Sequence, residues 1–241
     1  MPVSGSLKYF LPALCIIFLS YDAEAQQADF RQLFGDDWNK ALSFLNENDP
    51  WIRNALERYD IPYEEAIAVV FPELVRYSAI RDKLETGVLK ALYVNLGKDY
   101  ANFSIGQFQI KPSFAEKIRE NAKLLPGRTG RDLFGRKQPE ERELRSLIVS
   151  ELEAPEKEFS YVIAFYLLCV RNFKDLPGPA ESRIRFLAAA YNTGFWKNRE
   201  EIEKTAEMKF YSTKLVTKEY YSYCDVAIFW YRNHYQAHPA N

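Results

Sequence analysis

Histidine, cysteine and methionine are scarce in this chain of 241 residues, which contains two His, three Cys and two Met. Both histidines, His234 and His238, lie near the C-terminus, and no Cys and His residues have the spacing of a metal site. We therefore expect neither a metal nor a cofactor. Beyond the N-terminal segment, only Cys169 and Cys224 remain, and they can form either one disulfide or two buried thiols.

The chain also lacks an excess of charge of either sign. It carries 32 Lys and Arg against 33 Asp and Glu, and it has no basic block that could follow a phosphate backbone. We therefore expect no nucleic-acid partner.

No apolar run in the sequence has the length of a membrane-spanning helix. The run Phe10–Leu19 follows Lys8 and precedes Ala23-Glu24-Ala25, which has the A-x-A pattern of a signal-peptidase site. We therefore expect residues 1–25 to be a secretory signal peptide. The mature chain, without an integral membrane span, would be exported to the periplasm or secreted into the bacterial envelope.

Apolar residues recur at helical spacing along almost all of the mature chain, which predicts an all-α fold. Asp49-Pro50 is typical of a helix start, and Pro72 is expected to interrupt or bend a helix. A short extended piece is predicted over 103–110, with no series of strands. Residues 26–61 would form an N-terminal helical extension and residues 62–241 the main domain. The predicted helices cover 36–45, 50–59, 62–96 with an interruption at 72, 112–124, 140–152, 155–173, 179–191 and 217–233, and 197–207 would be a solvated helix or lid.

The first motif with chemical meaning is Phe71-Pro72-Glu73. Glu73 follows the apolar stretch Ala66–Phe71, and a carboxyl group against such a wall loses hydration. Desolvation raises the pKa of a carboxyl group toward the range of a general acid. The alternative interpretation is a solvated helix residue beside a kink.

Two further motifs supply polar groups. In the run from Ser104 to Pro112, Gly106 allows close backbone approach, and Gln107 and Gln109 would point to opposite faces if extended. In the run from Ala188 to Gly194, Tyr191 and Asn192 place an aromatic face and an amide at a helix end. A protonated carboxyl group with such neighbours is typical of a cleft that cleaves sugars.

The order of these motifs resembles the lytic transglycosylases of the Slt type, within the lysozyme-like superfamily. In that family a catalytic glutamate precedes a G-L-M-Q-I-x-P motif and an A-Y-N-x-G motif. The second motif stands here as Gly106-Gln107-Phe108-Gln109-Ile110-Lys111-Pro112, and the third as Ala190-Tyr191-Asn192-Thr193-Gly194.

The resemblance implies a lysozyme-like helical domain with extra helices at both ends. The domain would have a deep cleft that binds the glycan strands of peptidoglycan. A single glutamate, Glu73, would cleave the MurNAc-GlcNAc bond and give 1,6-anhydro products. The substrate-binding residues would be Ser104, Gly106, Gln107, Gln109, Tyr191 and Asn192.

The chain departs from the family pattern beside the glutamate, because Leu74 stands where the family has serine. Glu85-Thr86-Gly87 is closer to the family's E-S-G triplet, so Glu85 is an alternative acid. Asp99 is the nearest candidate for the second carboxylate of a hydrolytic muramidase. A non-catalytic protein that binds peptidoglycan, or an envelope scaffold with a lysozyme-like cleft, is a further alternative.

The C-terminal segment is rich in aromatic residues. Its stripe Val226, Ala227, Phe229 and Trp230 fits the buried face of a helix. We expect core packing, although Tyr220 or Tyr221 could reach the cleft.

Overall fold

The computed structural model describes residues 28–80, 86–136, 139–213 and 219–235. The expected signal peptide, the alternative acid Glu85 and His238 lie outside these residues. The described part is mostly helical, which confirms the all-α prediction. Its elements are α1 (Phe30–Phe34), α2 (Asp36–Glu57), α3 (Tyr63–Ile80), α4 (Thr86–Leu96), α5 (Pro112–Ala122), α6 (Thr129–Phe134), α7 (Glu141–Leu152), α8 (Pro155–Asn172), α9 (Ala180–Thr193), α10 (Arg199–Ala206), β1 (Lys209–Tyr211), β2 (Tyr221–Ser222) and α11 (Tyr223–Tyr235).

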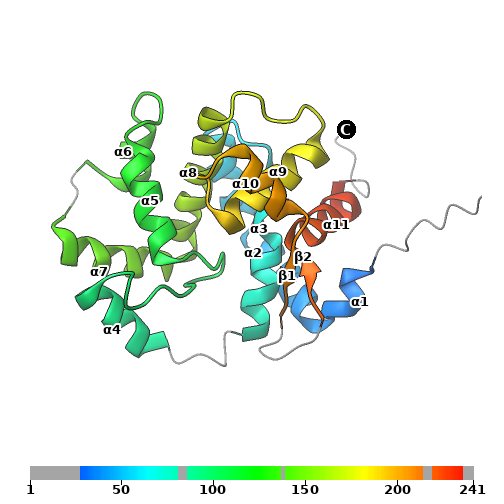
Figure 1. Cartoon of the computed structure of the whole chain (residues 1–241), viewed down its shortest axis with the longest axis horizontal. Coiled ribbons are helices and arrows are strands. Elements are labelled where there is room, and N and C mark those ends of the chain that lie inside the picture. The colour runs from blue at the N-terminus through cyan, green and yellow to red at the C-terminus, as the bar shows by residue number, and fades with distance from the viewer. Residues whose placement is uncertain (1–27, 81–85, 137–138, 214–218, 236–241) are drawn as a thin grey trace, which may run out of the picture.

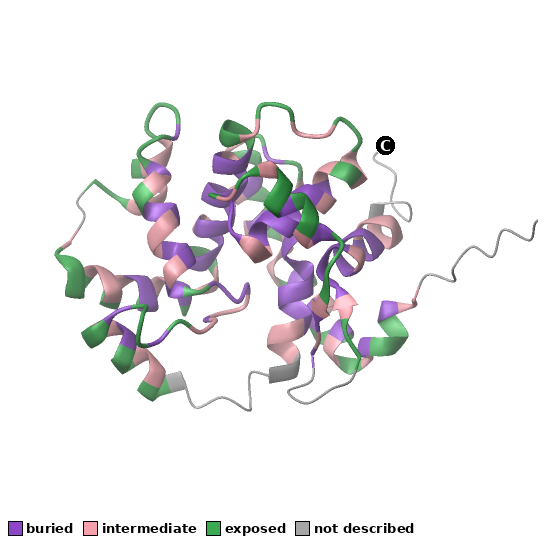
Figure 2. Cartoon of the chain, in the orientation of Figure 1, coloured by how far each residue is buried: buried purple, intermediate pink, exposed green. Residues whose placement is uncertain are grey.

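Helix α3 is the centre of the larger group of elements, where it packs against α2, α9 and α11 (Figure 1). Its run from Ala66 to Val75 is buried throughout, and Figure 2 shows that the neighbouring helices also carry buried residues. The ring of Phe71 lies between two tryptophans, with centroids 4.6 Å from Trp38 and 5.4 Å from Trp230. Trp230 is part of the expected apolar stripe of α11, whose packing into the core is thereby confirmed.

Helices α4 to α7 form a second group, at the left of Figure 1. Helix α8 contacts α2, α3 and α9 of the first group and α5, α6 and α7 of the second. It therefore joins the two groups along one buried helix.

The predicted helix break at Pro50 is wrong, because α2 runs through this proline without interruption. The predicted interruption at Pro72 is wrong as well, because α3 continues through it from Tyr63 to Ile80. Pro50 cannot donate a backbone hydrogen bond, which weakens the helix at this point. However, Ala41, Leu45, Ile52 and Leu56 form one continuous buried face. Burial along the whole face stabilises the helix more than the proline weakens it.

The start of the last helix was also predicted wrongly. Instead of a helix from 217, Tyr221 pairs with Tyr211 in an antiparallel two-stranded sheet, and α11 begins only at Tyr223. Tyr221 packs edge-on against Phe30 and Phe34 of α1, with centroids 5.6 and 5.8 Å apart. These contacts lie far apart in sequence, so local periodicity could not indicate them. The expected helix or lid over 197–207 is the short helix α10, whose N-terminus Asn198 caps.

The two cysteines are buried free thiols, which decides between the two alternatives in the sequence. Cys169 lies in α8, and the Cys224 thiol in α11 lies 3.4 Å from the carbonyl oxygen of Arg185. Among the described residues, no helix is both long and apolar enough to cross a bilayer.

A partly buried ion pair joins α3 to α9, and a tyrosine of α8 adds a hydrogen bond to it. The guanidinium of Arg183 donates to both carboxylate oxygens of Glu65, and its Nε lies 3.0 Å from Oε2. The hydroxyl of Tyr166 donates to the same oxygen at 3.0 Å. Glu65 is only 5% exposed, so its charge depends on these partners.

We expect Arg183→Met to lower the free energy of unfolding by about 3 kcal/mol, because it leaves the buried carboxylate of Glu65 without its cation. Urea denaturation measures this change. Lys117→Met is the matched control, since Lys117 pairs with Glu120 at the surface and its loss should cost less than about 1 kcal/mol. Equal effects of the two substitutions would contradict a special role for the buried pair.

Candidate active site

A cavity of about 220 Å³ lies where the two groups of helices meet. Its walls come from α3, from the segment before α5, from the start of α5, and from the end of α9 with the residues that follow. The lining consists of Glu73, Arg76, Asn102, Ser104, Gln109, Ile110, Lys111, Ser113, Phe114, Tyr191, Asn192, Thr193 and Trp196. Larger cavities of about 340 and 390 Å³ elsewhere contain none of the residues in the three motifs.

All three motifs contribute to this cavity. Of the predicted site residues, those that line it are Glu73, Ser104, Gln109, Tyr191 and Asn192. Gly106 and Gln107 lie in the same turn as Gln109 but do not line the cavity. Asp99, the candidate second carboxylate, is exposed in a turn and also lies outside the lining.

The carboxyl group of Glu73 is almost fully buried, at 4% exposure. Burial raises the pKa of this group, and the positive charges of Arg76 and Lys111 partly oppose that rise. The net effect is a raised pKa for Glu73, which agrees with the expectation drawn from the apolar stretch before it. The protonated form, which a general acid requires, is therefore favoured relative to a glutamate in water.

Two buried tyrosines hold the backbone of α3 beside Glu73. Pro72 interrupts the hydrogen-bond ladder at this point because it has no N–H group. The hydroxyl of Tyr223 donates to the carbonyl oxygen of Val69 at 2.9 Å, and that of Tyr211 donates to the carbonyl oxygen of Pro72 at 2.6 Å. The C-terminal aromatic segment thus positions the glutamate, although neither tyrosine lines the cavity.

The glutamine motif forms a tight turn rather than an extended strand. Ile105 and Ile110 exchange two backbone hydrogen bonds of 3.0 Å each, and these close the loop between them. Gln109 has a positive φ of 52°, and its side-chain amide donates to the carbonyl oxygen of Gly106 at 2.8 Å. The hydroxyl of Tyr191 donates to the carbonyl oxygen of Phe108 at 2.9 Å, so the third motif supports the second.

Glu158 lies beneath this turn and was not identified from the sequence. It is fully buried, and its Oε1 accepts from the backbone N–H of Phe108 at 3.0 Å, while Oε2 has no partner among the described residues. Burial raises the pKa of this carboxyl group well above its usual value, although backbone N–H groups of the turn lower it. In sequence, Glu158 is one of two acids in the first turn of α8, so nothing local distinguishes it from Glu156.

Glu158 also explains why glycine occupies position 106. Gly106 has a positive φ of 77°, and a Cβ atom there would lie 2.3 Å from Oε2 of Glu158 and 2.2 Å from the carbonyl oxygen of Leu152. Both the backbone conformation and the close approach therefore require glycine.

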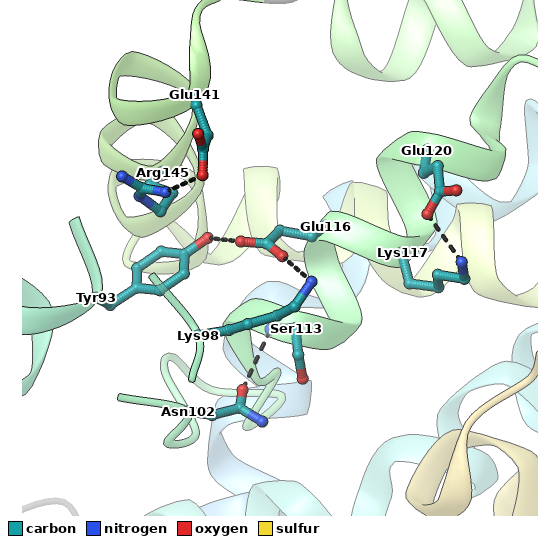
Figure 3. A network of polar contacts seen from close by, with 9 residues as sticks. All are labelled: Tyr93, Lys98, Asn102, Ser113, Glu116, Lys117, Glu120, Glu141 and Arg145. Atoms are coloured by element: carbon teal, nitrogen blue, oxygen red, sulfur yellow. Dashed lines mark hydrogen bonds and ion pairs between the residues drawn. The ribbon is translucent and has the colours of Figure 1, made fainter. Parts of the chain in front are cut away.

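A polar network lies beside Asn102 and Ser113 of the cavity lining (Figure 3). Glu116 of α5 accepts from the hydroxyl of Tyr93 in α4 and from the ammonium of Lys98, both at 2.9 Å. Beside them, the side-chain oxygen of Asn102 accepts from the backbone N–H of Ser113 at 3.2 Å. These bonds attach the segment before the glutamine motif to α4 and α5.

Among the described residues, no group of three or more His, Cys, Asp and Glu side chains could hold a metal ion.

We expect the stability of the protein to fall as the pH rises above about 4.5, the ordinary pKa of Glu158. A carboxyl group whose pKa is raised in the folded state stabilises that state at low pH, and the contribution is lost toward the folded pKa. Glu158→Gln removes this titration but keeps an oxygen that accepts from Phe108. Urea denaturation between pH 4.5 and 8 should give a flatter profile for this variant.

The negative charge of Glu73 contributes to the raised pKa of Glu158, and the pKa of Glu73 is raised as well. Glu73→Gln is therefore the companion variant for the pH profile. Glu158→Ala should destabilise the protein at every pH by about 2 kcal/mol, because the buried N–H of Phe108 loses its acceptor. Identical pH profiles for the wild type and Glu158→Gln would contradict the raised pKa.

No protein-family model, no curated protein and no solved structure matches this chain. A functional assignment therefore depends on the geometry of the cavity and on the motifs that line it.

Proposed function

We propose that the protein cleaves the glycan strands of peptidoglycan, with Glu73 as a single acid and base, and releases 1,6-anhydro products. The observation that carries the proposal is that Glu73 is the one carboxyl group lining the cavity in the described part of the chain. It is buried and its pKa is raised. The amide and hydroxyl groups of Ser104, Gln109 and Asn192 line the same cavity.

The reaction requires one carboxyl group in two roles. Glu73 gives its proton to the glycosidic oxygen as the bond from C1 of MurNAc to that oxygen breaks. The carboxylate then accepts the proton of the C6 hydroxyl of the same sugar, whose oxygen bonds to C1 and closes the anhydro ring. The proton balance closes, and no water is consumed.

Hydrolysis with a second carboxylate has less support. In glycosidases the second carboxyl group flanks the bond that is cleaved. Asp99 lies outside the cavity lining, and Glu158 is held under the glutamine turn by the N–H of Phe108. Neither side chain faces the cavity that a sugar would occupy.

Trp196 is an additional candidate for contact with the sugar. It lines the cavity, and it is 45% exposed although it contacts Phe114 and Phe195 at centroid distances of 5.8 and 5.3 Å. An exposed aromatic face fixed by two other rings suits the apolar face of a pyranose. Trp196 lies just beyond the third motif, so the motif pattern does not indicate it.

The first test is digestion of purified peptidoglycan by the protein lacking residues 1–25, with mass spectrometry of the soluble muropeptides. We expect anhydro-muropeptides from the wild type and a loss of at least about a hundredfold in Glu73→Gln, which cannot deliver the proton. Glu85→Gln should retain activity. Loss of activity in Glu85→Gln alone would move the acid to that position.

Two other outcomes would change the assignment. Products with reducing ends would indicate a hydrolytic muramidase. A protein that sediments with peptidoglycan but releases nothing would be the binding module or scaffold that the departure at Leu74 suggests.

Trp196→Ala should weaken the binding of peptidoglycan fragments by roughly tenfold, since a truncated aromatic contact typically costs more than ~1 kcal/mol. Tyr220→Ala is the matched control, because Tyr220 is 51% exposed and lies outside the cavity lining. Titration calorimetry on the inactive Glu73→Gln background measures both affinities. Equal affinities would exclude Trp196 as a sugar platform.

A further inference from the structure

The charges of the cavity are not balanced. In the described part of the chain, its lining contains one acid, Glu73, and two cations, Arg76 and Lys111. Both cations lie close enough to Glu73 for their charges to stabilise its carboxylate form. The lining therefore has an excess of one positive charge when Glu73 is ionised and of two when it is protonated.

Glu73 serves as the counter-ion of Arg76 in the free protein. A single nitrogen, Nη1 of Arg76, donates to both carboxylate oxygens of Glu73 at 2.9 and 3.0 Å. The Arg76 side chain is 23% exposed, and its guanidinium carbon lies 4.8 Å from the ring centre of Tyr211. No other carboxylate pairs with Arg76 among the described residues.

This ion pair conflicts with the proposed chemistry. An acid catalyst must carry a proton, and a protonated Glu73 no longer compensates the charge of Arg76. A largely buried guanidinium without a counter-ion is costly. Among the residues that the structure describes, the cavity lining has no second acid that could replace Glu73, so the missing negative charge would have to come from the bound ligand.

We propose that the cavity recognises a carboxylate carried by the muramic acid residue of the glycan, and that this carboxylate replaces Glu73 as the counter-ion of Arg76. The inference rests on the proposed function. The carboxylate belongs either to the free lactyl group of a peptide-free glycan or to the stem peptide attached there. Binding of the anion lets Glu73 take a proton from water and keep it for the glycosidic oxygen, and Lys111 adds a second positive charge.

The test is titration calorimetry on Glu73→Gln, which is inactive by design and carries the neutral form of the side chain. The first ligand is a GlcNAc–MurNAc tetrasaccharide with free lactyl carboxylates, and the second is the same sugar with these groups converted to methylamides. The first should bind at least tenfold more tightly. The third ligand is the tetrasaccharide with stem peptides. If its affinity exceeds that of the methylamide by the same factor, the peptide is a source of the anion.

The double variant Glu73→Gln with Arg76→Met should bind the free acid and the methylamide within twofold of each other. It contains neither charge of the pair, so it leaves no buried ion without a partner. Lys117→Met on the Glu73→Gln background is the matched control, because it removes a surface cation outside the cavity and should keep the preference.

The outcomes separate the two proposals. If the acid, the peptide-bearing sugar and the methylamide bind Glu73→Gln equally well, carboxylate recognition is wrong while glycan binding stands. If none of them binds, the proposed function fails and the inference fails with it. A preference for the acid that survives Arg76→Met would also overturn the role given to Arg76.

Discussion

The buried carboxyl group of Glu73 accepts two hydrogen bonds from Arg76, one turn further along α3, and the rest of the site is arranged around that contact. Burial favours the neutral acid, whereas the Nη1 group of Arg76 and the nearby charge of Lys111 favour the carboxylate. The two effects oppose each other, and the net result is a raised pKa. A ligand that adds or removes one charge in the cavity would therefore shift the protonation of this group.

The scaffold around the glutamate is built from contacts distant in sequence. Tyr211 and Tyr223 reach α3 from the C-terminal segment and donate to the backbone carbonyls of Pro72 and Val69, in the turn of helix just before Glu73. The glutamine turn is held from below by Glu158 of α8 and from the side by Tyr191 of α9. Because each of these bonds is buried, the cavity walls have few alternative arrangements at low energy.

Local patterns in the sequence were sufficient for most helices and for the position of the proposed acid. The apolar stretch before Glu73 correctly indicated a desolvated carboxyl group, and the stripe of α11 correctly indicated core packing. Errors came at Pro50, at Pro72 and before Tyr223, where local rules for helix ends conflicted with packing. At Pro50 a continuous buried face preserved the helix, and before Tyr223 contacts with α1 favoured a strand.

The amino-acid sequence by itself determined the charge balance, which depends on composition alone, and the helical periodicity and the three motifs, which depend on residues close together in the chain. Only the tertiary structure decided that Glu73, Gln109 and Tyr191 contribute to one site, that both cysteines are free, and that Asp99 lies outside the cavity. It alone revealed Glu158, whose burial is created by α8 packing under a turn fifty residues earlier in the chain. The neighbours of Glu158 at Gly106 and Phe108 are distant in the chain, so no pattern around position 158 could have indicated its burial.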